Sequence, residues 1–266
     1  MFNLLRKTLY DKRSFIIGWG LGLAFLAFLM VLFYPAFSND NGLDKLMASL
    51  PTELKSLKGL IGNLEDLKNL PGYLGGQLFD IRIPMFISVS SIILAVGLTV
   101  SEEEKGYVQT LLALPAGRIK VLIAKFLSIV LINLAIILTM VVGIYLGLAF
   151  INESINWIVL TKLCSMTLLL CICMTTIVFG IGLATGRRGI TMGLGVIIAA
   201  GSFIVTTFAK SVEWLQPYEK ISLFHYFPAS EVAKGNISLI NIIVLSGITL
   251  IALIIGLIFF RRRDIR

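Results

Sequence analysis

The sequence predicts an all-α, polytopic membrane protein with six transmembrane helices, an N-terminal interfacial elbow helix and both termini in the cytoplasm. Three observations support this fold class. Of the 266 residues, 57% are hydrophobic and only 14% are charged, whereas soluble domains carry about 25% charged residues. Six runs of 18 to 25 residues contain no Asp, Glu, Lys, Arg or His. The basic residues are also divided unequally between alternate connections.

The predicted spans are the charge-free runs 14–37, 83–100, 126–150, 163–184, 190–209 and 239–260. Each is close to the roughly 20 helical residues that cross a bilayer, and a helix satisfies its own backbone hydrogen bonds in lipid. The second run contains Pro84, which we place in the first helical turn, where a missing N–H is least costly. We treat residues 1–266 as a single transmembrane domain.

The charges outside the spans predict the orientation. With the N-terminus inside, the inner connections hold 14 basic and 5 acidic residues, and the outer connections hold 9 basic and 10 acidic residues. Basic residues collect on the cytoplasmic side of membrane proteins. We therefore expect a multi-pass protein of the cell (plasma) membrane with cytoplasmic N- and C-termini. The excess of basic residues is explained by topology, so no nucleic-acid partner is expected, whereas membrane lipid is.

Residues 1–13 combine basic and apolar side chains. Phe2, Leu5 and Leu9 fall on one helical face, with Arg6, Lys7 and Lys12 at its border. This pattern is typical of a helix lying in the inner leaflet interface. The alternative is a basic tail that only sets the topology.

Residues 38–82 form the only long outer segment. Leucines recur at helical spacing between Leu43 and Leu64, and Pro51, Gly59 and Pro71 interrupt them. We expect one or two short amphipathic helices on the outer membrane surface. Packing against the span ends is the favoured role, and a lid over an exit path is the alternative.

Residues 101–125 form the longest inner loop. Glu102, Glu103 and Glu104 suit the positive N-terminal end of a short helix. Pro115 then interrupts the chain before basic residues lead into the third span. From the residues alone, this loop is either a docking surface for a soluble partner or an ordinary capped connection.

Residues 210–238 are rich in aromatic side chains, which suit an interfacial belt: Trp214, Tyr218, Phe224, Tyr226 and Phe227. The only histidine, His225, lies among them. Because it has no paired acid or nucleophile in the pattern, we expect it to pack at the interface rather than to act in chemistry.

Several kinds of catalytic site are excluded by the sequence. There is no G-x-x-x-x-G-K-[ST] motif, so we do not expect this chain to bind or hydrolyse ATP. One histidine cannot form H-E-x-x-H, and no acidic residue lies within a predicted span. Cys164, Cys171 and Cys173 share one apolar run and are interpreted as small buried hydrophobic residues, so no metal site is expected.

Two patterns within the spans predict contacts between helices. Asn133 needs a partner in hydrocarbon, so its amide is expected to bond to another helix, with a role in lining a polar path as the alternative. Small residues that allow close approach recur at four-residue spacing: Gly18/Gly22, Gly143/Gly147, Gly182/Gly186 and Gly189/Gly193.

The chain resembles the permease subunits of ABC-2-type ATP-binding cassette exporters over nearly its whole length. The strongest stretch, residues 102–118 (EEEKGYVQTLLALPAGR), is similar to the family's acidic residues, glycine, apolar helix, proline and arginine between spans two and three. It departs from that pattern at Tyr107-Val108 and at Ala116-Gly117. The basic N-terminal stretch, the aromatic segment 223–228 and the ending 260–264 match in the same order.

The resemblance implies how the protein works. Members of the family pair with a separate ATPase subunit, which binds ATP and Mg, and two permease chains form the pore as a homodimer or heterodimer. The residues implied in ATPase docking are Glu102, Glu103, Glu104, Gly106, Tyr107, Val108, Leu111, Leu112, Pro115 and Arg118. No cofactor is expected on this chain itself. The resemblance also implies a prokaryotic source.

The predicted function is therefore the transmembrane subunit of an ATP-driven exporter that has no enzymatic activity of its own. Its mostly apolar spans suit an amphipathic or hydrophobic cargo, such as a drug, an antibiotic, a peptide or a lipid. The alternative is a polytopic immunity, sensor or scaffold protein without transport activity. A membrane-embedded enzyme is disfavoured because the sequence lacks the necessary side-chain combinations.

Overall fold

The computed structural model describes residues 2–38, 68–107, 118–209 and 212–262. These residues form helices and no strand. Six helical runs among these residues are long and apolar enough to cross a membrane. Five are single helices: α2 (Arg13–Ser38), α11 (Arg118–Ile151), α12 (Trp157–Thr185), α13 (Arg188–Phe208) and α15 (Leu239–Arg262). The second run in chain order is made of four consecutive elements: α7 (Leu70–Tyr73), η1 (Leu74–Arg82), α8 (Ile83–Leu98) and α9 (Val100–Glu104). The predicted six-span, all-α fold class is confirmed.

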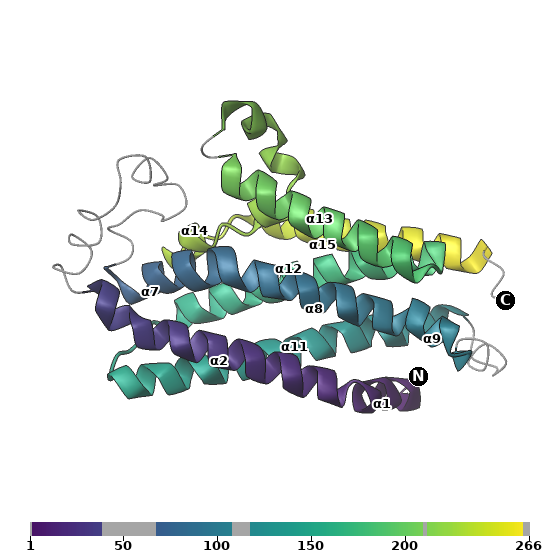
Figure 1. Cartoon of the computed structure of the whole chain (residues 1–266), viewed down its shortest axis with the longest axis horizontal. Coiled ribbons are helices and arrows are strands. Elements are labelled where there is room, and N and C mark those ends of the chain that lie inside the picture. The colour runs from purple at the N-terminus through teal and green to yellow at the C-terminus, as the bar shows by residue number, and fades with distance from the viewer. Residues whose placement is uncertain (1, 39–67, 108–117, 210–211, 263–266) are drawn as a thin grey trace.

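The long helices lie side by side along the longest axis of the molecule (Figure 1). One end carries α1 (Phe2–Asp11), α9 and the last turn of α15, and we call it the proximal end. The opposite, distal end carries α7 and α14 (Ala229–Ala233). Both ends of the chain therefore lie on one side of the bundle, as an even number of spans requires.

Helices α8 and α12 form the centre of the bundle. Helix α12 contacts α8, α11, α13 and α15, and the most apolar windows of α12 and of the run containing α8 are 72% buried. The most apolar stretches of α13 and α15 are each only 17% buried. Their exposed residues are still apolar, including Ile197 and Ile243, which is expected for surfaces that face lipid.

The closest helix pair is α2 and α11. A methyl group added at Gly143 would overlap the backbone carbonyl of Ala24, and one at Gly147 would lie 2.7 Å from Cβ of Val31. Small residues thus allow the two backbones to approach. In the other predicted pairs, a methyl group added at Gly182 would meet the Thr99 side chain. A methyl group added at four further glycines would have no neighbour within 4 Å among the described residues: Gly18, Gly22, Gly189 and Gly193.

The second span is longer than predicted. Residues 70–82 were assigned to the outer segment because Asp80 and Arg82 interrupt the charge-free run. The structure instead continues helically from Leu70 to Leu98, and Arg82 bonds to the main chain and side chain of Gln77. Pro84 does lie in the first turn of α8, but α8 continues from the π-helix η1. A proline here removes an α-helical donor, and the wider π-helical turn precedes it.

The other spans also extend beyond the charge-free runs. Helix α11 begins at Arg118 rather than at residue 126, and α12 begins at Trp157 rather than at residue 163. Lysine and arginine end helices in membranes without difficulty, because their long side chains can reach toward the headgroups. The absence of charge therefore marks the hydrocarbon crossing, not the whole helix.

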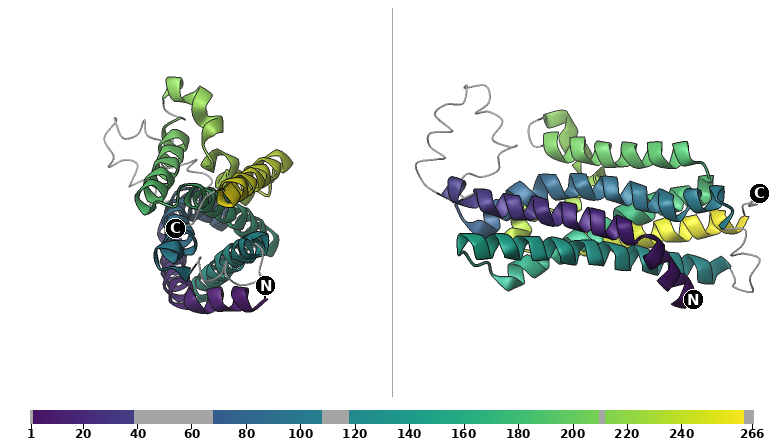
Figure 2. Two further views of the ribbon diagram at one scale, coloured as in Figure 1. Left: turned by 90° about the vertical axis from the view of Figure 1, so that its right-hand side faces the viewer. Right: turned by 60° about the horizontal axis from the view of Figure 1, so that its bottom comes forward.

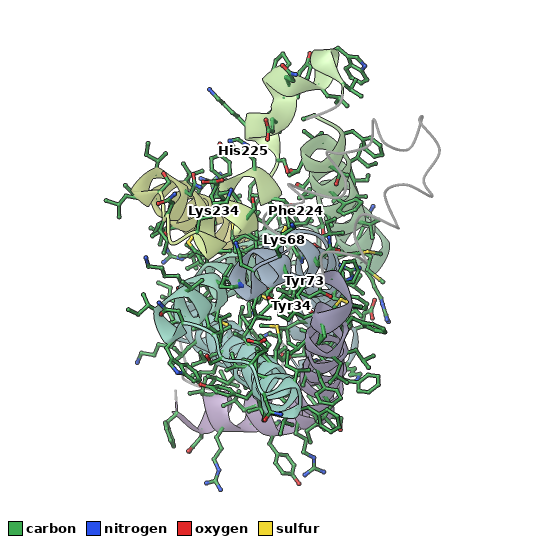
Figure 3. All side chains as sticks on the ribbon, turned by 90° about the vertical axis from the view of Figure 1, so that its left-hand side faces the viewer. Tyr34, Lys68, Tyr73, Phe224, His225 and Lys234 are labelled. Carbon is green, nitrogen blue, oxygen red and sulfur yellow. The ribbon has the colours of Figure 1, made fainter. Side chains whose placement is uncertain are left out.

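Tyrosines join α2 to α7 at the distal end (Figure 3). The Tyr34 hydroxyl donates to the Lys68 carbonyl at 2.9 Å, and the Tyr73 hydroxyl donates to the Met30 carbonyl at 3.0 Å. The two rings lie 5.4 Å apart. Residues 39–67, for which amphipathic helices and a packing or lid role are predicted, lie outside the described residues.

The aromatic segment before the last span is only partly a belt. Trp214 and Tyr218 of η2 (Glu213–Ile221) are exposed, but Phe224 of η3 (Phe224–Tyr226) and Phe227 are buried. The belt assignment was wrong for these two phenylalanines, because the chain folds back onto the bundle. His225 Nδ1 lies 3.1 Å from the Glu219 carboxylate, and both side chains are about one-third exposed.

Helix α1 departs from the axis of α2 and runs across the proximal end (Figure 2). Leu5 and Leu9 are half-buried, and Phe2 is 75% exposed. The predicted apolar face thus divides between the bundle and the surroundings. An exposed apolar residue beside basic ones suits a helix at a membrane interface.

Candidate functional site

The predicted docking segment starts at a break in the helix that forms the second span. Helix α8 ends at Leu98, and Thr99 has φ −117° and ψ −91° before α9 begins. Thr99 is 3% exposed, and its hydroxyl donates to the Ala95 carbonyl at 2.7 Å. The Cβ position of Gly182 on α12 lies against the Thr99 side chain. A larger residue at either position would push the break away from α12.

Two lysines bond to the backbone carbonyls beside this break. Lys125 of α11 donates to the Leu98 carbonyl at 2.7 Å. Lys12, between α1 and α2, donates to the Gly97 carbonyl at 3.1 Å. The last carbonyls of a helix lack helical partners, and cations at that end are favoured by the helix dipole. The end of α8 is thereby tied to two other helices.

Lys125 also binds the first glutamate after the break. Its ammonium lies 2.9 Å from the Glu102 carboxylate, and the two side chains are 6% and 21% exposed. One buried cation thus bonds to the last residue of α8 and to a carboxylate of α9. Removing one partner of such a pair leaves the other without compensation, which is costly in a buried place.

The remaining described residues of the segment lie nearer the surface. Glu104 is 4.0 Å from Arg188 at the start of α13, and both are exposed, so this pair contributes little to stability. The Lys7 ammonium lies 5.4 Å from the centre of the Tyr107 ring, which is 52% exposed. This contact joins α1 to the segment just after α9.

Gly106 turns the chain out of α9. Its φ is +73°, a left-handed value that glycine adopts without steric cost. Its N–H donates to the Glu103 carbonyl at 2.9 Å. Any other residue at this position would disfavour the turn that leads to Tyr107.

Only part of the predicted docking set can be placed. The structure brings Glu102, Glu103, Glu104, Gly106 and Tyr107 together at the proximal end. The apolar residues Val108, Leu111 and Leu112, and also Pro115, lie outside the described residues. Arg118 is the first residue of α11, and its side chain is likewise not described.

Sequence reasoning missed several residues that hold this site. Lys12 was placed at the border of the interfacial helix, Lys125 was counted only among the basic residues that set the topology, and Thr99 was placed inside a charge-free span. A usable signal was the position of each lysine within two residues of the start of a charge-free run. Burial lowers the pKa of Lys12 from its ordinary value, while the charge of Glu102 opposes this shift.

A polar cluster connects three helices inside the bundle. The Asn133 amide donates to the Thr175 hydroxyl at 3.3 Å, and the Thr175 hydroxyl lies 3.0 Å from that of Ser91 and 2.8 Å from the Cys171 carbonyl. Asn133, Thr175 and Ser91 are all buried. The expected bond from Asn133 to another helix is confirmed, linking α11, α12 and α8.

Groups that could bind a metal are not found in the described part of the chain, where no three His, Cys, Asp or Glu side chains come together. Cys171 and Cys173 are buried in α12, and Cys164 is half-buried. The described residues of the proximal site offer carboxylates, ammonium groups and an aromatic ring.

Comparison with models of known protein families gives a match over nearly the whole chain. The family model described as "ABC-2 family transporter protein" covers residues 2–265. No curated protein matches the chain.

Proposed function

This chain belongs to the ABC-2 family of transporter proteins, and from that membership we propose that it is the membrane subunit of an ATP-driven exporter that docks a separate ATPase through residues 102–118. It is a transmembrane permease, and permeases of this family generally work with an ATPase subunit. ATP and Mg are bound by that ATPase. A second permease chain, identical or different, completes the pore in the cell membrane of a prokaryote.

The observation that carries the proposed mechanism is the connection of the docking segment to the spans. The break at Thr99 separates α8 from α9, while Lys125 bonds to both sides of it. A displacement of α9 by a docked ATPase either moves α11 through Lys125 or breaks a buried ion pair. Because the second outcome is costly, movement of the segment is passed to α8 and α11.

Helix α1 provides a second connection. Lys12 bonds to the Gly97 carbonyl at the end of α8, and Lys7 contacts the Tyr107 ring of the docking segment, just after α9. An interfacial helix held at both points moves with the segment and carries α2 with it. The docking contacts themselves are an apolar helix in a groove of the partner, with Glu103, Glu104 and Arg118 setting orientation.

The cargo follows from the lining of the bundle. Apart from Lys125 at the proximal end, the buried polar side chains of the described residues are hydroxyls and the Asn133 amide, and these already bond to each other or to the main chain. Such a lining does not compensate a naked charge. We therefore propose an amphipathic or hydrophobic cargo, moved outward.

The docking assignment is tested by co-purification with the ATPase that the full chain retains from its native membranes. Leu111→Glu places a charge in the docking helix, and Tyr107→Ala removes an exposed ring. We expect each to reduce the retained ATPase by about tenfold or more, as loss of an interface anchor does. Tyr218→Ala is the matched control, because Tyr218 is equally exposed, at 53%, but belongs to η2.

Two results would contradict the proposal. Equal retention of ATPase by the Leu111→Glu variant and the wild-type chain would remove the docking assignment. Retained docking without ATP-dependent movement of any amphipathic cargo in proteoliposomes would favour a sensor or scaffold that binds a partner and transports nothing.

A further inference from the structure

A pocket of about 610 Å³ lies at the proximal end between α1, α8, α9 and the first turn of α13. Its charged lining comes from six side chains: Lys7, Asp11, Lys12, Glu102, Lys105 and Arg188. Four of these are basic and two acidic. Glu102 is paired with Lys125, and Arg188 lies 4.0 Å from the exposed carboxylate of Glu104. Even without these two residues the lining has Lys7, Lys12 and Lys105 against Asp11, so its net charge is positive.

Lys12 is the innermost of the basic groups. It is half-buried and uses one bond to the Gly97 carbonyl, and an ammonium group has three donors. Burial has lowered its pKa, which means that the charged form has lost hydration. A neighbouring anion compensates this loss, because opposite charges interact more strongly where water is scarce.

The other wall of the pocket is apolar. Phe15, Ile93 and Met192 line it, and they belong to the spanning helices α2, α8 and α13. Ile93 and Met192 are 45% and 38% exposed. The pocket thus combines a basic part beside the interfacial helix with an apolar part on the spans, which is the polarity of a phospholipid at a leaflet surface.

We propose that this pocket binds the phosphate head group of an anionic membrane phospholipid. The ammonium groups of Lys7, Lys12 and Lys105 and the guanidinium of Arg188 hold the phosphate, and Ile93 and Met192 contact the acyl chains. Basic pockets between spanning helices bind anionic head groups in this way. A lipid held there joins α1 to α9 and α13, three elements of the proximal end. The inference does not depend on the pairing with an ATPase.

The test is a lipid titration of the purified full chain in detergent, read by native mass spectrometry. The probes are phosphatidylglycerol, phosphatidylcholine with the same acyl chains, and inorganic phosphate. We expect one tight phosphatidylglycerol adduct, weaker phosphatidylcholine binding, and no displacement of the lipid by millimolar phosphate.

The variant is Lys105→Glu combined with Arg188→Glu, which reverses two exposed charges of the pocket. The control is Lys120→Glu combined with Lys220→Glu, which makes the same change in net charge at exposed positions outside it. We expect the pocket variant to bind phosphatidylglycerol about tenfold or more weakly and the control to bind like wild type. Lys105→Gln combined with Arg188→Gln removes the two charges without reversing them. This variant should also bind phosphatidylglycerol more weakly than the control and the wild type.

Three outcomes would overturn the proposal. Equal affinity for the two lipids would show that the head-group charge is not recognised. Equal loss in the pocket variant and the control would show a non-specific charge effect. Displacement of bound lipid by inorganic phosphate would identify a site for free phosphate instead.

Discussion

Thr175 connects three helices through a single hydroxyl group. It accepts from Asn133 of α11 and lies within hydrogen-bond distance of Ser91 of α8. Its neighbour Thr176 is equally buried, but its hydroxyl bonds only to the Ile172 carbonyl of its own helix. The two threonines therefore separate the effect of an interhelical bond from that of a buried hydroxyl.

We predict that Thr175→Val lowers the free energy of unfolding by about 1–2 kcal/mol, because the Asn133 amide is left without its partner. Thr176→Val is expected to cost less than about 0.5 kcal/mol. It removes only a bond to the Ile172 carbonyl, which is part of the hydrogen-bonded backbone of the same helix. Thermal unfolding of the purified variants in detergent measures the difference. Combining Asn133→Leu with Thr175→Val should cost less than the sum of the two single changes, and additive costs would contradict this account.

The break at Thr99 depends on contacts from other helices rather than on its own sequence. No glycine or proline stands at residues 98–100. Lys12 and Lys125 bond to the carbonyls of α8, and α12 supplies the space at Gly182. The end of α8 is therefore a tertiary feature, which explains why the local pattern predicts an uninterrupted span there.

We predict that Lys125→Met lowers the free energy of unfolding by about 1–3 kcal/mol, below the 3–5 kcal/mol of a fully buried pair because Glu102 is partly exposed. Glu102→Gln should cost less, and a double-mutant cycle between the two should give a coupling energy of about 0.5–3 kcal/mol. Lys120→Met is the matched control on the same helix. Because Lys120 is exposed, its change should stay within about 0.5 kcal/mol. A zero coupling energy would show that the ion pair contributes nothing.

The orientation of the whole chain in the membrane follows from charges that lie at the two ends of the bundle. We predict that the proximal end is cytoplasmic, because the inner connections carry 14 of the 23 basic residues. In a variant without Cys164, Cys171 and Cys173, Lys220→Cys should react with a membrane-impermeant maleimide in intact cells. Lys120→Cys, at the other end, should react only after permeabilisation. The reverse pattern would place the docking segment outside and remove the ATPase proposal.

The sequence was sufficient for the six spans and for the helix contacts made by Asn133, Gly143 and Gly147. The spans and the Asn133 bond follow from the cost of charge and of an unpaired amide in lipid, and the glycine contacts follow from the small size of these residues. The extension of the second span was hidden because Asp80 and Arg82 end the apolar run. The roles of Lys12 and Lys125 were hidden because they depend on carbonyls about 85 and 27 residues away along the chain.

The helical run from Leu70 to Leu98 has a mechanical consequence. At about 1.5 Å per residue it is a rod of roughly 40 Å. It is anchored near Thr99, and its far end carries Tyr73, which packs against Tyr34 of α2. For a rod of this length, a tilt of about 5° at the anchored end displaces the far end by about 3–4 Å. A displacement of this size is larger than a hydrogen bond tolerates, so it would break the bond from the Tyr73 hydroxyl to the Met30 carbonyl. A force applied at one membrane face would thus separate the Tyr34 and Tyr73 rings at the other.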